Sequence, residues 1–156
     1  MKLLIDTNVW IDFFLPARND HINAQELIGY CEKFNVEMYA AFHSITNFNY
    51  IFKNNLKLLY KNKLSSEEIN KLAWNATNNI IHSATIVGAD YGDAYGAFIY
   101  KDIHNDYEDD IVYILAQKAK TDYIVTNDKN MIKHSPIGAY NTKDALKLVI
   151  ATYERN

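Results

Sequence analysis

The chain has 156 residues, of which 49% are hydrophobic, and a formal net charge of −3. This composition predicts one folded domain over residues 1–156, and it excludes both a disordered chain and a strongly basic nucleic-acid-binding protein. The apolar opening carries Asp6 and Asp12, which argues against a signal peptide. No apolar run approaches the about 20 residues that span a bilayer. Cys31 is the only cysteine, so no internal disulfide can form. We therefore expect a cytoplasmic protein.

Short apolar runs alternate along the chain with longer segments of helical spacing. Strands are expected at residues 2–5, 36–40, 84–87, 123–126 and 136–139. Helices are expected at about 9–15, 21–34, 44–59, 65–82, 106–120 and 142–153, and a helix is favoured at 91–100. Ser44 or Thr46 is the expected cap of the third helix, and Ser65 with Glu68 forms a capping box before the fourth. The alternation predicts an α/β fold, a Rossmann-like parallel sheet with helices on both faces.

Three aspartates are expected at one rim of this sheet. Asp6 follows the first strand, and Asp128 follows the strand expected at 123–126. Asp109 lies in the first turn of the helix that leads into that same strand. Because ligands bind at the carboxyl ends of parallel strands, the topology predicts that these three side chains converge on a ligand site.

Converging carboxylates repel one another unless a cation lies between them. An all-oxygen group of ligands suits Mg²⁺ or Mn²⁺, which can activate water and stabilise charge on a phosphodiester. Taken one at a time, the acids have simpler explanations. Asp6 and Asp128 could cap helices, and Asp109 could be one of several acids at a helix start. Only their combination favours a metal site.

Three motifs in this order resemble the PIN-domain family: residues 4–12 (LIDTNVWID), 106–110 (DYEDD) and 124–131 (IVTNDKNM). The resemblance implies a Rossmann-like PIN domain with Mg²⁺- or Mn²⁺-dependent endoribonuclease activity. Its commonest bacterial members are VapC-type toxins, which cleave RNA, often form homodimers and are silenced by a partner antitoxin. The resemblance therefore implies an RNA substrate, a cognate antitoxin and a homodimer. The lack of an apolar run long enough to span a bilayer predicts no membrane partner.

The family motifs also assign roles to individual residues. Asp6, Asp109 and Asp128 match the metal-binding and catalytic acids of the family. Neighbouring side chains are expected to orient or support these ligands: Thr7, Thr126, Asp106 and Asp110.

Asn47 departs from the family pattern. The family usually carries a glutamate early in the third helix, where residues 44–51 read SITNFNYI and place Asn47. A neutral amide binds a hard cation more weakly than a carboxylate does, and it cannot act as a general base. We expect Asn47 to be an auxiliary ligand or a hydrogen-bond partner of water on the metal, and therefore part of the catalytic group.

Lys53, Lys57 and Lys61 recur every four residues, which places them on one stripe of the third helix if the helix extends that far. Such a stripe predicts contacts with RNA phosphates, although a solvated helix face is the more common reason for it.

Two alternatives to a toxin ribonuclease stay open. The first is a catalytically weakened PIN module that binds RNA or a protein partner, with Asn47 as the mark of lost chemistry. The second is a phosphatase or phosphotransferase of another Rossmann-like class, such as an enzyme of the haloacid-dehalogenase type. Such an enzyme needs Asp-x-Asp after the first strand, and this chain has Asp6-Thr7-Asn8 there.

Overall fold

In the computed structural model, which describes residues 1–103 and 106–154, parallel strands form a sheet of order β3-β2-β1-β4-β5. The strands are β1 (Lys2–Ile5), β2 (Glu37–Ala41), β3 (Thr85–Val87), β4 (Tyr123–Val125) and β5 (Ala139–Tyr140). The helices are α1 (Thr7–Phe14), α2 (His21–Lys33), α3 (Phe42–Leu59), α4 (Ser66–Ser83), α5 (Tyr91–Gly96), α6 (Tyr107–Lys118), α7 (Lys129–His134) and α8 (Thr142–Tyr153). A short 3-10 helix, η1 (Ala97–Tyr100), follows α5. The predicted α/β fold with a parallel sheet is confirmed.

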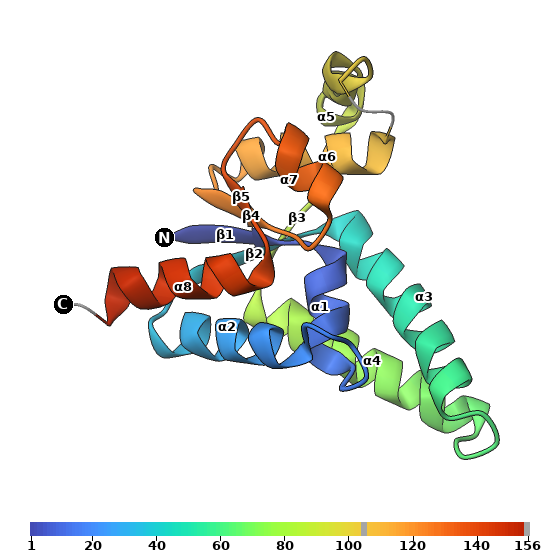
Figure 1. The fold of residues 1–156 in the computed structure, drawn as a ribbon. Helices are drawn as coiled ribbons and strands as arrows, with labels where there is room; N and C mark the ends of the chain where they lie inside the picture. Colours follow the sequence, from blue (N-terminus) through green and yellow to red (C-terminus); the bar gives the residue numbers. More distant parts are fainter. Residues whose placement is uncertain (104–105, 155–156) are drawn as a thin grey trace.

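Helices cover the sheet on both faces, with α1, α2, α4 and α8 on one side and α6 and α7 on the other (Figure 1). β1 contributes apolar side chains to both faces of the sheet, because successive side chains of a strand point in opposite directions. Leu3 and Ile5 belong to the larger core, whereas Leu4 packs in the smaller core with Val112 of α6. Within the described residues, none of the helices has the length and apolar character needed to cross a bilayer.

The capping box of Ser65 and Glu68 is confirmed at the start of α4. The expected caps of the third helix were wrong. β2 leads directly into α3, so the helix begins at Phe42 after the extended residue Ala41, which makes no side-chain cap. Ser44 is therefore buried inside the helix. Thr46 also lies within the helix, and its hydroxyl donates to the His43 carbonyl (2.8 Å).

The expected fifth strand was wrong in its bounds. Residues 129–134 form α7, a helix too short to show an apolar periodicity, and the chain then turns before β5 begins at Ala139. Pro136 falls in this turn, where its missing N–H costs no sheet hydrogen bond. Segment 91–100 is helical as favoured, but its second half is the 3-10 helix η1.

The strand order places a topological switch point between β1 and β4. From β1 the chain builds β2 and β3 on one side, and it then returns to build β4 and β5 on the other. The Asp6 N–H donates to the Val125 carbonyl (2.9 Å), and the Thr126 N–H donates to the Tyr140 carbonyl (3.0 Å). Asp6 and Thr126 thus lie side by side where an open α/β sheet binds its ligands.

Candidate active site

Asp6 is held by donors from two strand ends. It caps α1, and its Oδ1 accepts the Thr7 N–H at 2.7 Å. Its Oδ2 accepts the Thr126 hydroxyl at 2.7 Å and the Asn8 amide at 2.8 Å. Burial raises the pKa of Asp6 to about 6, the bonds from Thr126 and Thr7 oppose this shift, and the charges of Glu108 and Asp128 add to it. The carboxylate is therefore fixed in direction and costly to ionise.

Asp128 is tied to the same hydroxyl. It caps α7, with Oδ1 accepting the N–H groups of Asn130 (2.7 Å) and Met131 (3.1 Å). Its own N–H donates to Thr126 Oγ1 at 3.1 Å. Asp6 and Asp128 are thus helix caps and also neighbours of one buried threonine, so the cap and site explanations are compatible.

Asp109 lies in the first turn of α6. Asp106 caps this helix, and its Oδ1 accepts the N–H groups of Glu108 (3.0 Å) and Asp109 (3.3 Å). Burial raises the pKa of Asp109 to about 7, and the charges of Asp106, Asp6, Asp128 and Glu108 add to the shift. The charges of Asp6 and Asp128, which lie on two other elements, therefore act on Asp109.

This group is not a ready-made metal cage. Among residues 1–103 and 106–154, no three His, Cys, Asp or Glu side chains already stand close enough to hold an ion. Coordination of one ion by Asp6, Asp109 and Asp128 therefore stays a prediction.

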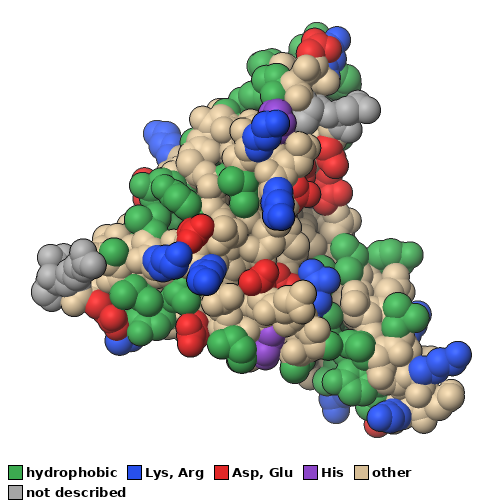
Figure 2. Space-filling model, viewed as in Figure 1, with side chains coloured by type: hydrophobic (Ala, Val, Ile, Leu, Met, Phe, Trp, Pro, Cys, Tyr) green, Lys and Arg blue, Asp and Glu red, His purple; other side chains and the backbone are tan. Residues whose placement is uncertain are grey.

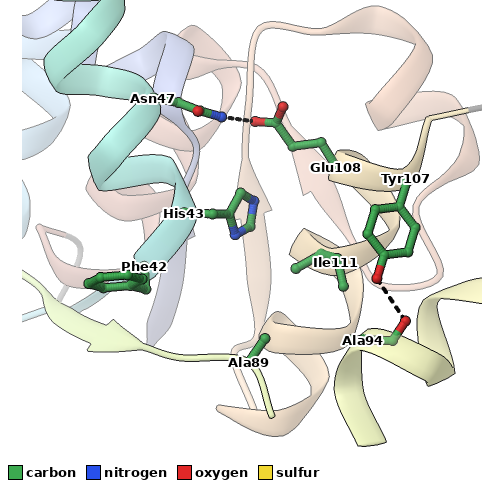
Figure 3. A pocket seen from close by; sticks show the side chains of 8 residues that line it. All are labelled: Phe42, His43, Asn47, Ala89, Ala94, Tyr107, Glu108 and Ile111. Atoms are coloured by element: carbon green, nitrogen blue, oxygen red, sulfur yellow. Dashed lines mark hydrogen bonds between the residues drawn. The ribbon is translucent and has the colours of Figure 1, made fainter. Parts of the chain in front are cut away.

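Asn47 lies in the second turn of α3 and meets a carboxylate that the sequence analysis did not single out. Its Nδ2 donates to Glu108 Oε1 at 2.5 Å, between α3 and α6 (Figure 3). The one available signal for Glu108 was its place directly before Asp109 in an acidic helix start. Its partner lies 61 residues away, so that place alone did not reveal the contact.

Asn8 is a second residue that sequence reasoning missed. Its amide donates to Asp6 and also to Thr126 Oγ1 (3.0 Å), while its Oδ1 accepts the Asn127 N–H (3.0 Å). Of the side chains expected to orient the ligands, Thr126 contacts Asp6 through its hydroxyl. Thr7 contacts Asp6 through its backbone N–H. The buried hydroxyl of Thr7 has no hydrogen-bond partner among the described residues. Asp110 is buried on α6.

A cavity of about 440 Å³ lies next to Glu108, the residue before Asp109. Its wall is largely apolar, with Asn47 and Glu108 at one end and Tyr107 at another (Figure 3). The Tyr107 hydroxyl donates to the Ala94 carbonyl (2.9 Å), which fixes the ring against α5. Burial lowers the pKa of His43 in this wall, the Glu108 charge opposes that shift, and His43 Nε2 has no hydrogen-bond partner within the described residues. The cavity offers an apolar surface with a few polar groups, as small-molecule sites do.

The lysine stripe is shorter than expected. α3 ends at Leu59, so Lys53 and Lys57 lie on the helix, whereas Lys61 lies in the turn after it. Figure 2 shows acidic side chains gathered over α6, and basic side chains at the far end of α3 and α4. Whether the three lysines contact RNA stays a prediction.

A family model described as the PIN domain matches residues 2–130. No curated protein matches the chain. The fold is similar to that of PAE2754 from Pyrobaculum aerophilum, with 12% identity and a TM-score of 0.68, over 97% of this chain and 96% of that one. It is also similar to Mycobacterium tuberculosis VapC20, described as a Sarcin-Ricin loop cleaving toxin, with 10% identity and a TM-score of 0.62 over 84% and 93% of the two chains. The fold is also similar to that of VapBC2 from Rickettsia felis, solved bound to a DNA fragment from its promoter. The identity is 12% and the TM-score is 0.61, over 90% of this chain and 98% of that one.

Proposed function

This chain belongs to the PIN domain family, as its three motifs predicted, and on that premise we propose that it is a divalent-metal-dependent ribonuclease. The observation that carries the proposal is the placement of Asp6 and Asp128 beside one buried threonine at the switch point of the sheet, with Asp109 close enough for their charges to raise its pKa. Membership of this family removes the haloacid-dehalogenase alternative.

The residues present suit Mg²⁺ or Mn²⁺. The donors are carboxylate oxygens, which hard divalent cations prefer. Burial and, to a smaller extent, neighbouring charges raise the pKa values of Asp6 and Asp109, so these acids are costly to ionise, and a cation between them would offset that cost. We expect Asp6, Asp109 and Asp128 to hold the ion and to be drawn closer together by it.

The surrounding side chains would prepare this group before the metal arrives. Thr126 and Asn8 hold Oδ2 of Asp6 in one direction, so that carboxylate needs no reorientation. Asp106 organises the first turn of α6 and thereby places Asp109. When bound, a divalent ion would lower the pKa of water and stabilise negative charge on a phosphodiester.

The adjoining cavity supports a nucleic-acid substrate with unpaired bases. A base next to the cleaved phosphodiester could enter this cavity and stack on Phe42, which is 60% exposed at its edge. The choice of RNA rests on the family resemblance.

We further propose that the enzyme is the toxin of a type II toxin–antitoxin pair, that it acts in the cytoplasm as a homodimer, and that an antitoxin silences it. The support is the likeness in fold to VapC20, described as a toxin, and to VapBC2 on promoter DNA. A small neighbouring gene that encodes a DNA-binding protein, and whose product blocks cleavage by this chain, is the expected finding.

The test of the activity is cleavage of a labelled structured RNA with Mn²⁺, with EDTA and by Asp6→Asn. We expect cleavage with Mn²⁺ alone and none in the other two reactions. RNA binding without cleavage under all three conditions would favour the weakened PIN module instead.

A further inference from the structure

We propose that Glu108 takes the place of the carboxylate that Asn47 lacks, so that α6 supplies two adjacent acids, Glu108 and Asp109, to the metal-binding group. This inference rests on the proposed function and adds a ligand that the family motif does not assign.

The first support is the contact itself. Figure 3 shows Asn47 of α3 and Glu108 of α6 pointing toward each other. The Asn47 amide donates to Glu108 Oε1 at 2.5 Å. An amide cannot supply negative charge at this point of the site, but here it holds a side chain that does. Asn47 then positions a ligand, much as the Asn8 amide holds Asp6.

The second support is the position of Glu108 beside both the cavity and the acid group. Glu108 and Asn47 line the cavity of about 440 Å³. Glu108 also directly precedes Asp109 in the first turn of α6.

Helix capping does not account for this geometry. The cap of α6 is Asp106, whose carboxylate already accepts two backbone N–H groups. An acid that merely complements the helix dipole needs no side-chain partner. The bond to Asn47 instead fixes the Glu108 carboxylate on the side of the group where α3 contributes no charge.

The test is titration of the purified metal-free protein with Mn²⁺ by calorimetry, which does not depend on activity. Glu108→Gln keeps an acceptor for Asn47 but removes the charge, and we expect Mn²⁺ affinity to fall on the order of tenfold. Asn47→Glu combined with Glu108→Gln exchanges amide and carboxylate between the two helices at constant net charge. This double variant should recover most of the lost affinity.

Two controls separate the possible failures. Glu26→Gln removes an exposed carboxylate from α2 and should bind Mn²⁺ like the wild type. Asp6→Asn reports on the proposed function. If the wild type binds no Mn²⁺, or Asp6→Asn binds it unchanged, the proposed function and this inference both fail. If Asp6→Asn loses binding while Glu108→Gln keeps it, or if the exchange recovers nothing, only the inference about Glu108 is overturned.

Discussion

The hydroxyl of Thr126, at the end of β4, donates a 2.7 Å hydrogen bond to the carboxylate of Asp6, at the end of β1, across 120 residues of sequence. The same oxygen accepts the backbone N–H of Asp128. One buried hydroxyl thus links two acids of the proposed metal group, and its removal should disturb both.

Thr126→Val keeps the shape of the side chain but removes the donor to Asp6 and the acceptor for the Asp128 N–H. We expect Mn²⁺ affinity and cleavage rate to fall about 10- to 100-fold, as when groups that orient metal ligands are lost. The free energy of unfolding should fall by about 1–3 kcal/mol, because a buried N–H loses its partner. Thr126→Ser retains the hydroxyl and should retain metal affinity. Calorimetry and urea unfolding of both variants provide the measurement, and equal Mn²⁺ affinity in the Val and Ser variants would contradict the prediction.

Asp6→Asn should separate activity from stability. A bound metal ion contributes several kcal/mol of charge stabilisation to a phosphodiester reaction, so cleavage should fall at least about 100-fold. The free energy of unfolding in EDTA should stay the same or rise, because the amide oxygen can still cap α1 and no charge has to be buried. Exposed Asp102→Asn is the matched control and should change neither quantity. A large loss of stability in Asp6→Asn would instead assign this carboxylate to the fold.

The metal-free protein should become less stable as the pH rises from about 4 to about 7. Burial raises the pKa of Asp6 to about 6 and that of Asp109 to about 7, against a reference of 3.8. Within this window the folded state therefore binds more protons than the unfolded state, and the free energy of unfolding falls with rising pH.

The comparison with Asp109→Asn isolates the Asp109 part of this effect. The variant should gain stability over the wild type steadily as the pH rises, with no gain below about pH 4. Urea unfolding in EDTA at a series of pH values measures the difference, and parallel curves would exclude Asp109 as its source.

Phe42→Ala tests whether the cavity takes a base. Loss of one stacked base should weaken binding of single-stranded RNA by about 1–3 kcal/mol. Leu58→Ala is the matched control, because Leu58 is 79% exposed at the far end of the same helix. Fluorescence anisotropy with a labelled oligonucleotide and inactive Asp6→Asn protein measures binding without cleavage. Equal weakening by the two alanine variants would show that Phe42 makes no specific contact with a base.

Changing Lys53, Lys57 and Lys61 together to Gln tests the basic residues. Each lost phosphate contact should flatten the salt dependence of RNA binding by about 0.7 units of slope. Since Lys61 lies beyond α3, restoring it alone should recover less than restoring either Lys53 or Lys57 alone. Unchanged affinity and slope would identify the stripe as an ordinary solvated surface.

The sequence by itself determined the parts of this protein that depend on local chemistry. An apolar strand that ends in Asp6, the capping box of Ser65 and Glu68, and three ordered motifs were sufficient for the parallel sheet and the family. These signals are readable because each lies within a few residues, where backbone periodicity and capping decide the structure.

Only the tertiary structure decided which side chains meet across elements. β2 ends at Ala41 and α3 begins at the next residue, Phe42, so the capping signals of Ser44 and Thr46 were misleading. Asn47 and Glu108 are in contact because the N-terminal ends of α3 and α6 approach each other, and no local pattern encodes a pair separated by 61 residues. Hydrogen bonds between side chains depend on ångström-scale placement of whole helices, which arises from packing of the hydrophobic clusters against the sheet.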